Sequence, residues 1–464
     1  MSLPDLKKID SSVLRAADIR GVAGLTLDSD TAERIGKAFG SVLIRQKINR
    51  VVVGGDGRLS TPKLSQALIA GLLSCGLEVV DIGCCPTPML YFASFVTDRC
   101  GGVMVTASHN PKEYNGFKMV IDKRSFCGEE IQNLGRIIER GDFESGEGSL
   151  KSDHFLPRYV DRLIQDFQTG GKELTVVWDC GNGTAGVVVP ELAKRLPGRH
   201  IVLNEKVDGN FPAHAPDSSR IENLTELRET VLKEKADLGL AFDGDSDRLG
   251  VIDSEGILLE TDRLLPIFAE EILRTRPGAV FIADIKSSKT FSEEILRMGG
   301  KPLIWKTGHS FIKEKMRETN SPLGGEMSGH ICFADKYYGF DDALYAAIRL
   351  LNIASCRQTE TLQDRIHQIP KTFATPEIKI PCPDSEKLAV IDKIKAKVRE
   401  FGFFCDETDG IKVVYPSSAW GLLRASNTSP FLIMRCEADT PEELERIKTQ
   451  LFQQIRSIYP IEMK

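Results

Sequence analysis

The chain has 464 residues, of which 41% are hydrophobic and 27% charged, and 66 acidic against 60 basic side chains give a formal net charge of −6. This length is enough for about three or four domains, and the acidic balance excludes a general attraction to nucleic acid or to anionic membranes. No apolar run approaches the ~20 residues of a membrane-spanning helix, no signal peptide begins the chain, and the cysteines form no CxxC pair. We therefore expect a cytoplasmic protein with neither a disulfide framework nor a zinc cluster.

The predicted elements alternate, along most of the chain, between short apolar strands and amphipathic helices. In chain order we expect strands at residues 50–54, 78–82, 102–106, 174–178, 238–242 and 279–284, and helices at 60–73, 185–196 and from about 290. Strands that alternate with helices are typical of parallel α/β sheets. The pattern restarts three times, so the sequence predicts three similar α/β domains.

The composition changes after the third α/β pattern, where Pro376, Pro381 and Pro383 interrupt the chain. The remaining residues combine short strands with two charged helices, at about 385–401 and 441–458. This pattern predicts a smaller α+β domain that follows a proline-rich linker. The predicted domains are therefore residues 1–154, 155–255, 256–370 and 371–464.

Residues 243–248, which we call the aspartate loop, directly follow an apolar strand. In an extended segment side chains alternate, so Asp243, Asp245 and Asp247 are expected to project to one side. Three carboxylates that close repel one another unless a cation lies among them, and oxygen ligands favour Mg²⁺ or Ca²⁺. An EF-hand is excluded, because Arg248 and Ser254 stand where its loop needs Gly and Glu. The alternative is a solvated acidic turn.

Residues 106–111, the serine loop, also end an apolar strand. Ser108 followed by His109 suggests a hydrolase, yet neighbours in an extended chain point in opposite directions and the Gly-x-Ser-x-Gly elbow is absent. A serine in such a loop can instead carry a phosphate, which needs a cation or basic groups to neutralise it. The alternative is a purely structural turn.

Two further loops offer polar groups suited to a sugar phosphate. The sugar loop, residues 324–330, presents a carboxylate, a hydroxyl and an imidazole between glycines, and residues 307–309 offer a similar set. Such groups pair with sugar hydroxyls, which both donate and accept hydrogen bonds. The arginine loop, residues 424–430, combines a guanidinium, hydroxyls and an amide, as an anchored phosphate requires. Ordinary turns remain the alternative for each.

Together the four loops resemble the α-D-phosphohexomutase superfamily, in which loops of these kinds occur in this order. The resemblance extends from residues 15–21 (Arg-Ala-Ala-Asp-Ile-Arg-Gly) to the arginine loop. Residues 325–330 and 424–428 are similar to the bacterial phosphomannomutase/phosphoglucomutase branch, whereas the phosphoglucosamine branch typically reads Glu-Gln-Ser-Gly-His and Arg-x-Ser-Gly-Thr there. One departure is Ala17, where an aromatic residue is often found, so a contact to the sugar is missing or supplied elsewhere.

The resemblance implies three similar mixed α/β domains and a smaller C-terminal α+β domain around a central cleft. It implies reversible transfer of phosphate between C1 and C6 of mannose or glucose phosphates, through a phosphoserine at Ser108 and a 1,6-bisphosphohexose intermediate. The implied cofactors are Mg²⁺, held by the three aspartates and Ser108, and a hexose 1,6-bisphosphate activator. Expected partners are small-molecule hexose phosphates only, with no nucleic acid or membrane, and the expected state is a monomer.

The resemblance also assigns roles to individual residues. The catalytic set is Ser108, Lys118, Arg248 and His330, and the metal ligands are Ser108, Asp243, Asp245 and Asp247. The substrate-binding set is Arg20, Lys286, Gly308, His309, Glu326, Met327, Ser328, Gly329, Arg424, Ala425, Ser426, Asn427 and Thr428. Glu326 and Ser328 would recognise the sugar hydroxyls, and the arginine loop would hold the phosphate that does not react.

The proton carrier is left open between Lys118 and His330. Lys118 could act as a base only if burial or neighbouring cations lowered its pKa. Two other functions are also weighed. A phosphoglucosamine mutase is disfavoured by Met327, and a non-catalytic sugar-phosphate sensor should lack Ser108 or one of the aspartates, all of which are present.

Overall fold

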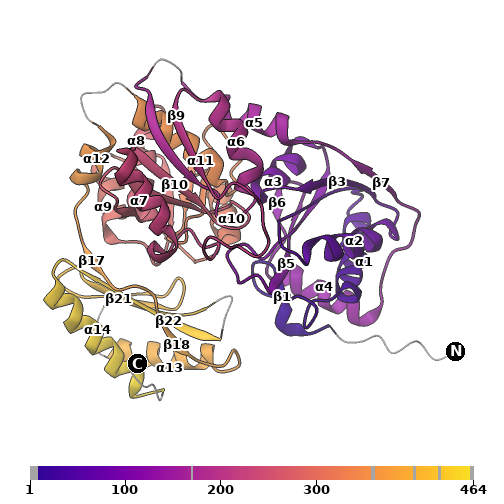
Figure 1. Cartoon of the computed structure of the whole chain (residues 1–464). Coiled ribbons are helices and arrows are strands. Elements are labelled where there is room, and N and C mark those ends of the chain that lie inside the picture. The colour runs from indigo at the N-terminus through magenta and orange to yellow at the C-terminus, as the bar shows by residue number, and fades with distance from the viewer. Residues whose placement is uncertain (1–8, 169–170, 357–360, 401–403, 427–429, 460–464) are drawn as a thin grey trace. The chain divides into compact units, whose positions relative to one another are not determined.

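The computed structural model describes residues 9–168, 171–356, 361–400, 404–426 and 430–459. The chain divides into two compact units (Figure 1). The first unit comprises Met1–Thr261 and Ser328–Gln363, and the second comprises Asp262–Met327 and Asp364–Lys464. Among the described helices, none is long and apolar enough to cross a membrane.

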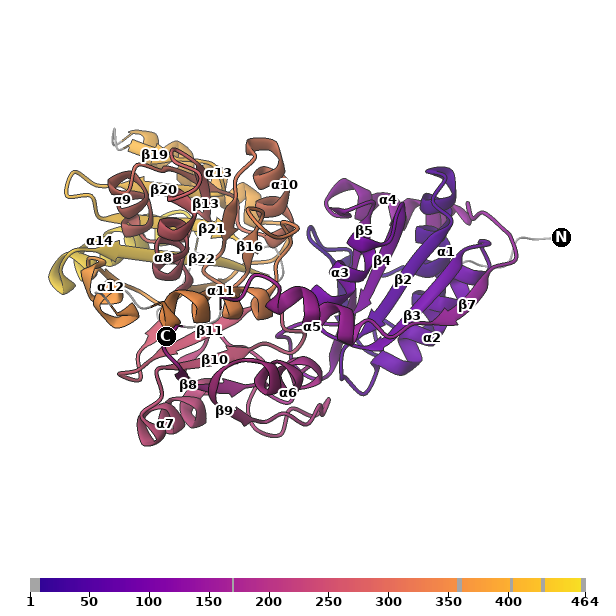
Figure 2. The ribbon, with the colours of Figure 1, turned by 90° about the horizontal axis from the view of Figure 1, so that it is seen from above.

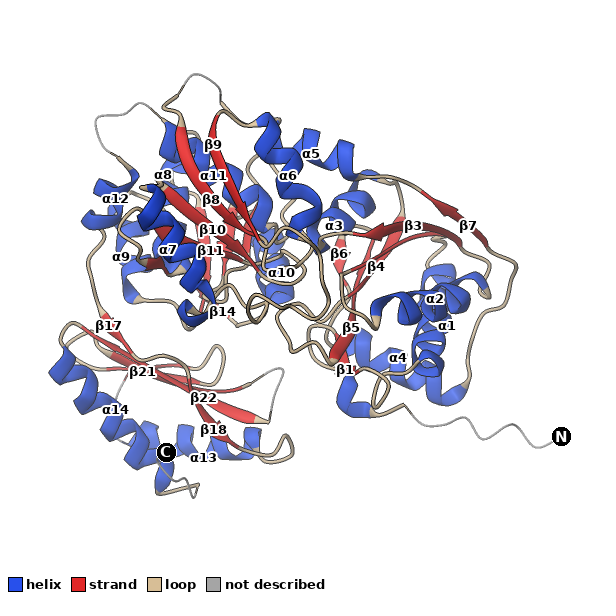
Figure 3. Cartoon of the chain, in the orientation of Figure 1, coloured by secondary structure: helices blue, strands red, loops and turns tan. Residues whose placement is uncertain are grey.

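The first unit begins with a mixed sheet in the order β1-β5-β4-β2-β3-β7, with β6 paired to β5. Its strands are β1 Ile19–Val22, β2 Arg50–Gly55, β3 Glu78–Cys84, β4 Cys100–Val105, β5 Tyr114–Ile121, β6 Arg124–Ser125 and β7 Ser149–Ser152. Its helical segments are the 3₁₀ turn Ser11–Val13 and helices α1 Ser29–Arg45, α2 Thr61–Leu73, α3 Thr87–Val96, α4 Glu129–Arg140 and α5 Leu156–Ile164. Figure 3 shows α1, α2 and α4 on one side of the sheet and α3 on the other.

The core of this first sheet follows from the alternation of side chains along its strands. Val51 and Val53 of β2 pack with Phe39 of α1 and Leu68 of α2 in one buried cluster. The neighbouring strands β2, β3 and β4 run parallel (Figure 2), whereas β5 runs antiparallel to β4. The serine loop lies in the connection that reverses the chain between β4 and β5.

The second sheet of the first unit has the order β12-β11-β10-β8-β9. Its strands are β8 Leu174–Asp179, β9 Gly198–Leu203, β10 Leu238–Phe242, β11 Leu249–Asp253 and β12 Leu258–Leu259. Strands β9, β8 and β10 are parallel, and β11 is antiparallel to β10. The aspartate loop makes this second reversal. The other elements of this part are α6 Ala185–Arg195, the 3₁₀ turn Ile221–Leu224, α7 Thr225–Glu234, β16 Ile331–Phe333, α11 Ala343–Ser355 and α12 Leu362–Gln368, which continues into the second unit.

The second unit contains the parallel strands β14, β13 and β15 and an antiparallel sheet near the C-terminus. The elements of the former are α8 Thr261–Leu273, β13 Val280–Asp284, α9 Lys289–Arg297, β14 Lys301–Trp305, α10 His309–Thr319 and β15 Leu323–Gly325. Those of the latter are β17 Phe373–Ala374, β18 Ile378–Pro381, α13 Lys387–Glu400, β19 Phe404–Asp406, β20 Ile411–Val414, β21 Trp420–Ala425, β22 Phe431–Ala438 and α14 Pro441–Arg456. Apolar side chains of α13 and α14 pack against β21 and β22.

The structure corrects one expectation about the sheets. Alternating strands and helices predicted parallel sheets, but β5 and β11 each run antiparallel to the strand before them. Neither strand was among the elements expected from the alternating pattern, whereas the mixed sheets that the family resemblance implied are present. The two reversals place the serine loop and the aspartate loop at the carboxyl ends of β4 and β10.

Candidate active site

The hydroxyl of Ser108 is buried and contacts the aspartate loop. Its Oγ donates a hydrogen bond to Oδ2 of Asp243 at 2.6 Å, and its backbone N–H donates to Oγ1 of Thr106 at 2.9 Å. Ser108 has φ +51°, the left-handed region that a serine rarely adopts. A residue held in such a conformation indicates that its surroundings constrain it strongly.

One expectation about the serine loop is wrong. His109 was expected to point away from Ser108, but Oγ of Ser108 lies 3.3 Å from Nδ1 of His109. The reason is the left-handed backbone at Ser108, since side chains alternate only along an extended chain. Burial, together with the cations of Arg248 and Arg20, lowers the pKa of His109 well below its usual range.

The three aspartates of the aspartate loop converge. Asp243, Asp245 and Asp247 are fully buried, and each offers a carboxylate oxygen within 4.8 Å of the others. They meet through a tight turn with φ +63° at Ser246, and not through the extended segment expected from the sequence. Burial and the charges of Asp247 and Asp245 raise the pKa of Asp243 well above its usual range. A cation among these groups would relieve that repulsion.

The donor atoms fit a divalent cation with hard oxygen ligands. Oδ2 of Asp245 accepts hydrogen bonds from Oγ1 of Thr87 at 2.6 Å and from Nζ of Lys118 at 2.7 Å. Its other oxygen, Oδ1, is buried and has no hydrogen-bond partner in the described parts of the chain. Three carboxylates beside a serine oxygen form the kind of oxygen set that Mg²⁺ prefers.

Lys118 lies inside this acidic group. Its ammonium pairs with Asp245 and Asp247, and the side chain is buried on β5. Burial favours the neutral amine, but the carboxylates outweigh it and raise the pKa of Lys118. The lowered pKa that a base would need is therefore not found in this arrangement, because the neighbours of Lys118 are anions and not the expected cations.

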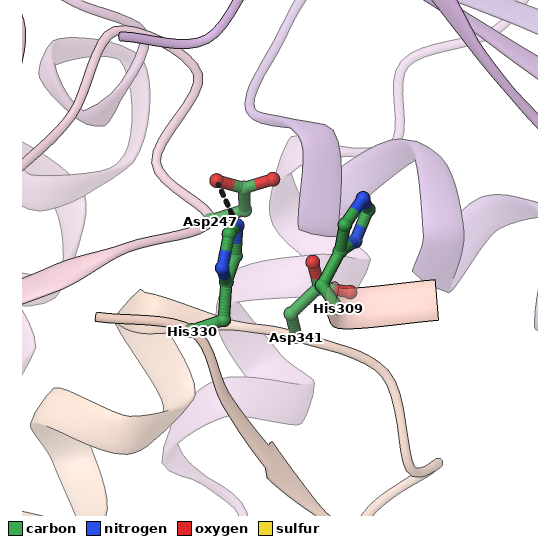
Figure 4. Close-up of side chains that lie close together, drawn as sticks. All are labelled: Asp247, His309, His330 and Asp341. Carbon is green, nitrogen blue, oxygen red and sulfur yellow. Dashed lines mark ion pairs between the residues drawn. The ribbon is translucent and has the colours of Figure 1, made fainter. Parts of the chain in front are cut away.

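Arg248 and His330 border the same group. Nε of Arg248 lies 3.9 Å from Oδ2 of Asp243, the oxygen that accepts the Ser108 hydroxyl. Nε2 of His330 lies 3.4 Å from Oδ1 of Asp247 (Figure 4), and Nδ1 of His330 lies 2.9 Å from Oγ of Ser328. The Ser328 contact orients the ring so that Nε2 faces the acidic group.

The sugar loop is tied to this part of the first unit by its glycine. The carbonyl of Gly329 accepts a hydrogen bond from the N–H of Leu249 at 3.0 Å. Gly329 has φ +100°, and a Cβ there would lie 3.0 Å from the Leu249 carbonyl oxygen, so a side chain would be strained. Elsewhere in the first unit, Nη1 of Arg20 in β1 donates to Oδ1 of Asn110 in the serine loop at 2.8 Å.

The second unit assembles its own polar cluster at the carboxyl ends of β13 and β15. Asp284 and Glu326 are buried there. The N–H of Gly308 donates to Oε1 of Glu326 at 2.6 Å, and the N–H of Met327 donates to Oδ1 of Asp284 at 3.2 Å. Parallel strands bring their carboxyl ends to one edge of a sheet, which is where ligands bind in such folds.

Lys286 belongs to the same cluster, and His309 lies next to Gly308, whose N–H binds Glu326. Nζ of Lys286 lies 2.9 Å from Oε1 of Glu377 and 3.6 Å from Oδ2 of Asp284. Burial favours the neutral amine, but these carboxylates outweigh it and raise the pKa of Lys286. His309 begins α10 and is buried, with Nδ1 3.3 Å from Nζ of Lys313.

Arg424 occupies a strand and not the turn expected from the sequence. It is the penultimate residue of β21, and its Nε donates to Oδ2 of Asp409 at 2.8 Å. The same oxygen accepts the N–H of Thr307 at 3.0 Å. Nη2 of Arg424 is buried and has no hydrogen-bond partner in the part of the chain that the structure describes.

The rest of the arginine loop is described only in part. Ala425 ends β21, and the N–H of Ser426 donates to the carbonyl of Phe431 at 2.9 Å. Asn427 and Thr428 lie outside the described residues.

Sequence reasoning missed several acidic residues of these clusters. Asp341 offers a carboxylate oxygen within 4.8 Å of ligand atoms of Asp247 and His330. Asp284 accepts the N–H of Met327 in the sugar loop, and Asp409 accepts the N–H of Thr307. Only Asp284 had a visible signal, as the last residue of an expected strand.

The comparisons with known proteins agree with this geometry. Family models of phosphoglucomutase/phosphomannomutase match the chain as α/β/α domain I at residues 11–145, domain II at 157–256, domain III at 260–373 and the C-terminal domain at 377–454. The chain belongs to this family. It is a mutase enzyme, as predicted, and the predicted fold class of four domains with mixed sheets is confirmed.

Similar proteins support the same assignment along the whole chain. A phosphomannomutase/phosphoglucomutase of Pseudomonas aeruginosa PAO1 is 45% identical over 458 residues, covering 99% of this chain and 98% of that protein. A phosphoglucomutase of Neisseria gonorrhoeae is 40% identical, covering 96% and 97%. A crystal structure of a family protein from Burkholderia thailandensis matches with a TM-score of 0.91 and 41% identity, covering 97% and 98%. These relatives do not favour the phosphoglucosamine or non-catalytic alternatives.

Proposed function

We propose that this mutase moves phosphate between C1 and C6 of glucose and mannose phosphates, with Ser108 as the covalent phosphate carrier and a 1,6-bisphosphohexose as intermediate. The observation that carries the proposal is the hydrogen bond from Oγ of Ser108 to Asp243, inside a buried group of three aspartates. A free hydroxyl has no need of three converging carboxylates, whereas a phosphoserine that shares a cation with them does.

The proposed metal is Mg²⁺, and the proposed ligands are Asp243, Asp245, Asp247 and an oxygen carried by Ser108. When bound, the ion offsets the charge on the phosphoryl group as it is transferred. Arg248 lies within reach of the same place, so its guanidinium would hold the phosphate on Ser108. A hexose 1,6-bisphosphate is the proposed activator, because an enzyme that loses its phosphate needs one to restore it.

The proposed proton carriers are Lys118 and His330. Lys118 hydrogen-bonds Asp245 and pairs with Asp247, and His330 lies 3.4 Å from Asp247. With its raised pKa, Lys118 suits the role of proton donor to a sugar oxygen and not that of base, so His330 is the group proposed to accept a proton from a sugar hydroxyl that approaches Ser108.

The remaining site residues are proposed to bind substrate. Glu326 and Ser328 would contact the sugar hydroxyls, while Arg20, Lys286, Gly308, His309, Met327 and Gly329 would line the site. Arg424, Ala425, Ser426, Asn427 and Thr428 would hold the phosphate that is not reacting. Because the substrate must bind with either phosphate toward Ser108, these contacts have to serve two orientations.

Replacing Arg424 by alanine should raise KM for both glucose 1-phosphate and mannose 1-phosphate by roughly 10- to 100-fold, since a hydrogen bond to a charged group contributes about 1.5–3 kcal/mol. The buried Nη2 of Arg424 is the donor available for the phosphate. If the contact is equal in the ground and transition states, kcat should change little. Arg399→Ala is the control and should leave KM unchanged. Arg399 lies on the exposed side of α13, where its guanidinium pairs with Glu407. A change in sugar preference with unaltered phosphate affinity would contradict this role of the arginine loop.

The proposed substrate class is tested by a coupled assay with Mg²⁺ and glucose 1,6-bisphosphate. We expect turnover of glucose 1-phosphate and mannose 1-phosphate, and kcat/KM for glucosamine 1-phosphate lower by ~10-fold or more, because one altered substituent is worth about 1–3 kcal/mol in a shaped site. Glucosamine 1-phosphate as the best substrate would contradict the proposal.

The proposed organisation places the serine loop in residues 1–154, the aspartate loop in 155–255, the sugar loop in 256–370 and the arginine loop in 371–464. We propose that the protein acts as a cytoplasmic monomer on small-molecule hexose phosphates, without nucleic acid or membrane partners. The net charge of −6 supports the last part of this proposal, because it provides no general attraction to nucleic acid or to an anionic membrane.

A further inference from the structure

The side chain of Arg58 is almost entirely buried and holds the serine loop from behind. Its Nη2 donates hydrogen bonds to the carbonyl oxygens of Ser108 and Asn110, both at 2.7 Å. Its Nη1 donates to the carbonyl oxygens of Pro111 at 2.6 Å and Tyr114 at 3.1 Å. One guanidinium thus binds four carbonyl oxygens within residues 108–114, the segment that leads from β4 into β5.

Asp56 fixes the other side of this guanidinium. Its Oδ2 accepts hydrogen bonds from Nε of Arg58 at 3.0 Å and from Oγ1 of Thr106 at 2.8 Å. The same Thr106 hydroxyl accepts the N–H of Ser108. Both backbone polar groups of Ser108, its N–H and its carbonyl, are therefore connected to the Asp56–Arg58 pair, and this residue has the disfavoured φ of +51°.

The aspartate loop contacts this assembly closely. A Cβ at Gly244 would lie 2.6 Å from the carbonyl oxygen of Ser108, which Arg58 also binds. The ring of Phe211 covers Arg58, with its centroid 5.2 Å from the guanidinium carbon, and it also lies beside Gly244. Arg58 thus binds the serine loop directly and is linked to the aspartate loop through the Ser108 carbonyl and the ring of Phe211.

We propose that Arg58 is a positioning residue for phosphoryl transfer. By binding the four carbonyl oxygens, it keeps Oγ of Ser108 in place beside the aspartates. The inference rests on the proposed role of Ser108. Arg58 does not contact the reacting atoms. It keeps the serine backbone in a conformation that the chain would otherwise leave, and small displacements of a reacting group lower rates steeply.

Lysine cannot replace this arginine. A guanidinium presents five N–H donors in a flat, rigid fork, whereas an ammonium has three donors at one point. The Arg58→Lys variant therefore keeps the buried charge but loses the geometry that gathers the carbonyls, so it separates positioning from charge.

The test measures transfer of the phosphoryl group from glucose 1,6-bisphosphate to Ser108 by intact mass. In this step the P–O bond of the sugar ester breaks, the Oγ–P bond forms, and the serine proton ends on the released sugar hydroxyl. For Arg58→Lys we expect a rate of phosphorylation roughly 10²-fold below that of the wild type, since misplacement by about 1 Å has effects of this size. We expect the affinity for glucose 1-phosphate, measured by calorimetry on the unphosphorylated protein, to remain within about threefold.

Arg349→Lys is the matched control. Arg349 is equally buried in the same unit, and its guanidinium pairs with both oxygens of Asp335 at 2.9 Å. The Arg349→Lys change should lower the melting temperature, as Arg58→Lys does. Ser108 should nevertheless be phosphorylated at the wild-type rate in this control. Phe211→Leu is the milder second variant, with phosphorylation expected to slow by about 3- to 10-fold, and it is the deciding variant if Arg58→Lys does not fold.

Three outcomes are distinguishable. Slow phosphorylation with unchanged sugar-phosphate affinity in the Arg58→Lys or Phe211→Leu variant, but not in the control, supports the inference. The inference would be overturned if the variants of Arg58 and Phe211 that fold were phosphorylated at the wild-type rate. It would also be overturned if Arg349→Lys slowed phosphorylation by the same factor. Phosphate uptake by Ser108→Ala, measured alongside, would instead contradict the proposed role of Ser108, whatever the other variants do.

Discussion

Replacing Ser108 by alanine is expected to lower kcat by at least ~10³-fold, about 4 kcal/mol of transition-state stabilisation. The physical reason is that the hydroxyl is the proposed bond-forming atom, the one that would carry the phosphate beside Asp243. Intact mass should show one phosphate on part of the wild type and none on the variant. The change removes one oxygen from a loop, so the variant should fold and still bind glucose 1-phosphate.

The control for this prediction is Ser94→Ala. Ser94 is also buried in the first unit, but its hydroxyl donates to the carbonyl of Tyr91 in α3. Its replacement should leave turnover and phosphate incorporation unchanged. Turnover near the wild-type rate in Ser108→Ala would contradict the phosphoserine mechanism.

Replacing Asp245 by asparagine is expected to lower kcat by at least ~10²-fold, since a cation at a phosphoryl transfer site is worth several kcal/mol. Asparagine can still accept the hydrogen bond of Thr87 through its amide oxygen. It loses the second carboxylate oxygen, Oδ1, which is buried and without a partner in the described chain. The variant therefore separates cation binding from the hydrogen bonds that hold the loop.

Titration of activity with Mg²⁺ is the measurement. Asp245→Asn should need a higher Mg²⁺ concentration for half-maximal activity, while calorimetry shows unaltered binding of glucose 1-phosphate. The control is Asp253→Asn, because Asp253 is buried at the far end of β11, where its Oδ1 accepts the N–H groups of Glu255 and Ile257. Full activity and an unchanged Mg²⁺ requirement in Asp245→Asn would make the aspartate loop a structural turn.

The elements and loops were predictable where the information is local. Strand β10 was placed at residues 238–242, and the structure has it at Leu238–Phe242, because a continuous apolar run between polar turns suits a buried strand. Helix α2 ends where predicted, and it begins one residue later, at Thr61, beside a proline that favours a helix start. The four loops were recognisable because each places its polar side chains within about seven consecutive residues.

The expectations that failed concern how the backbone and side chains turn at the site. The sequence could not show that Ser108 and Ser246 adopt left-handed conformations, because these are imposed by neighbours and not preferred by serine. It could not show that Lys118 faces anions, because its partner Asp245 is 127 residues away. Strands β5 and β11 were not among the predicted elements, so the chain reversals that make the sheets mixed were not visible in the alternation of strands and helices either.

Sequence was therefore sufficient for the identity of the chemical groups, their order along the chain and the kind of ligand that they suit. These properties follow from side-chain chemistry and short-range pattern alone. Tertiary structure was needed for the arrangement of those groups: the serine hydroxyl on Asp243, the ammonium of Lys118 among the aspartates, and the guanidinium of Arg58 behind the serine loop. Such contacts join residues that are 50 to more than 100 positions apart, and they form only when packing brings separate strands together.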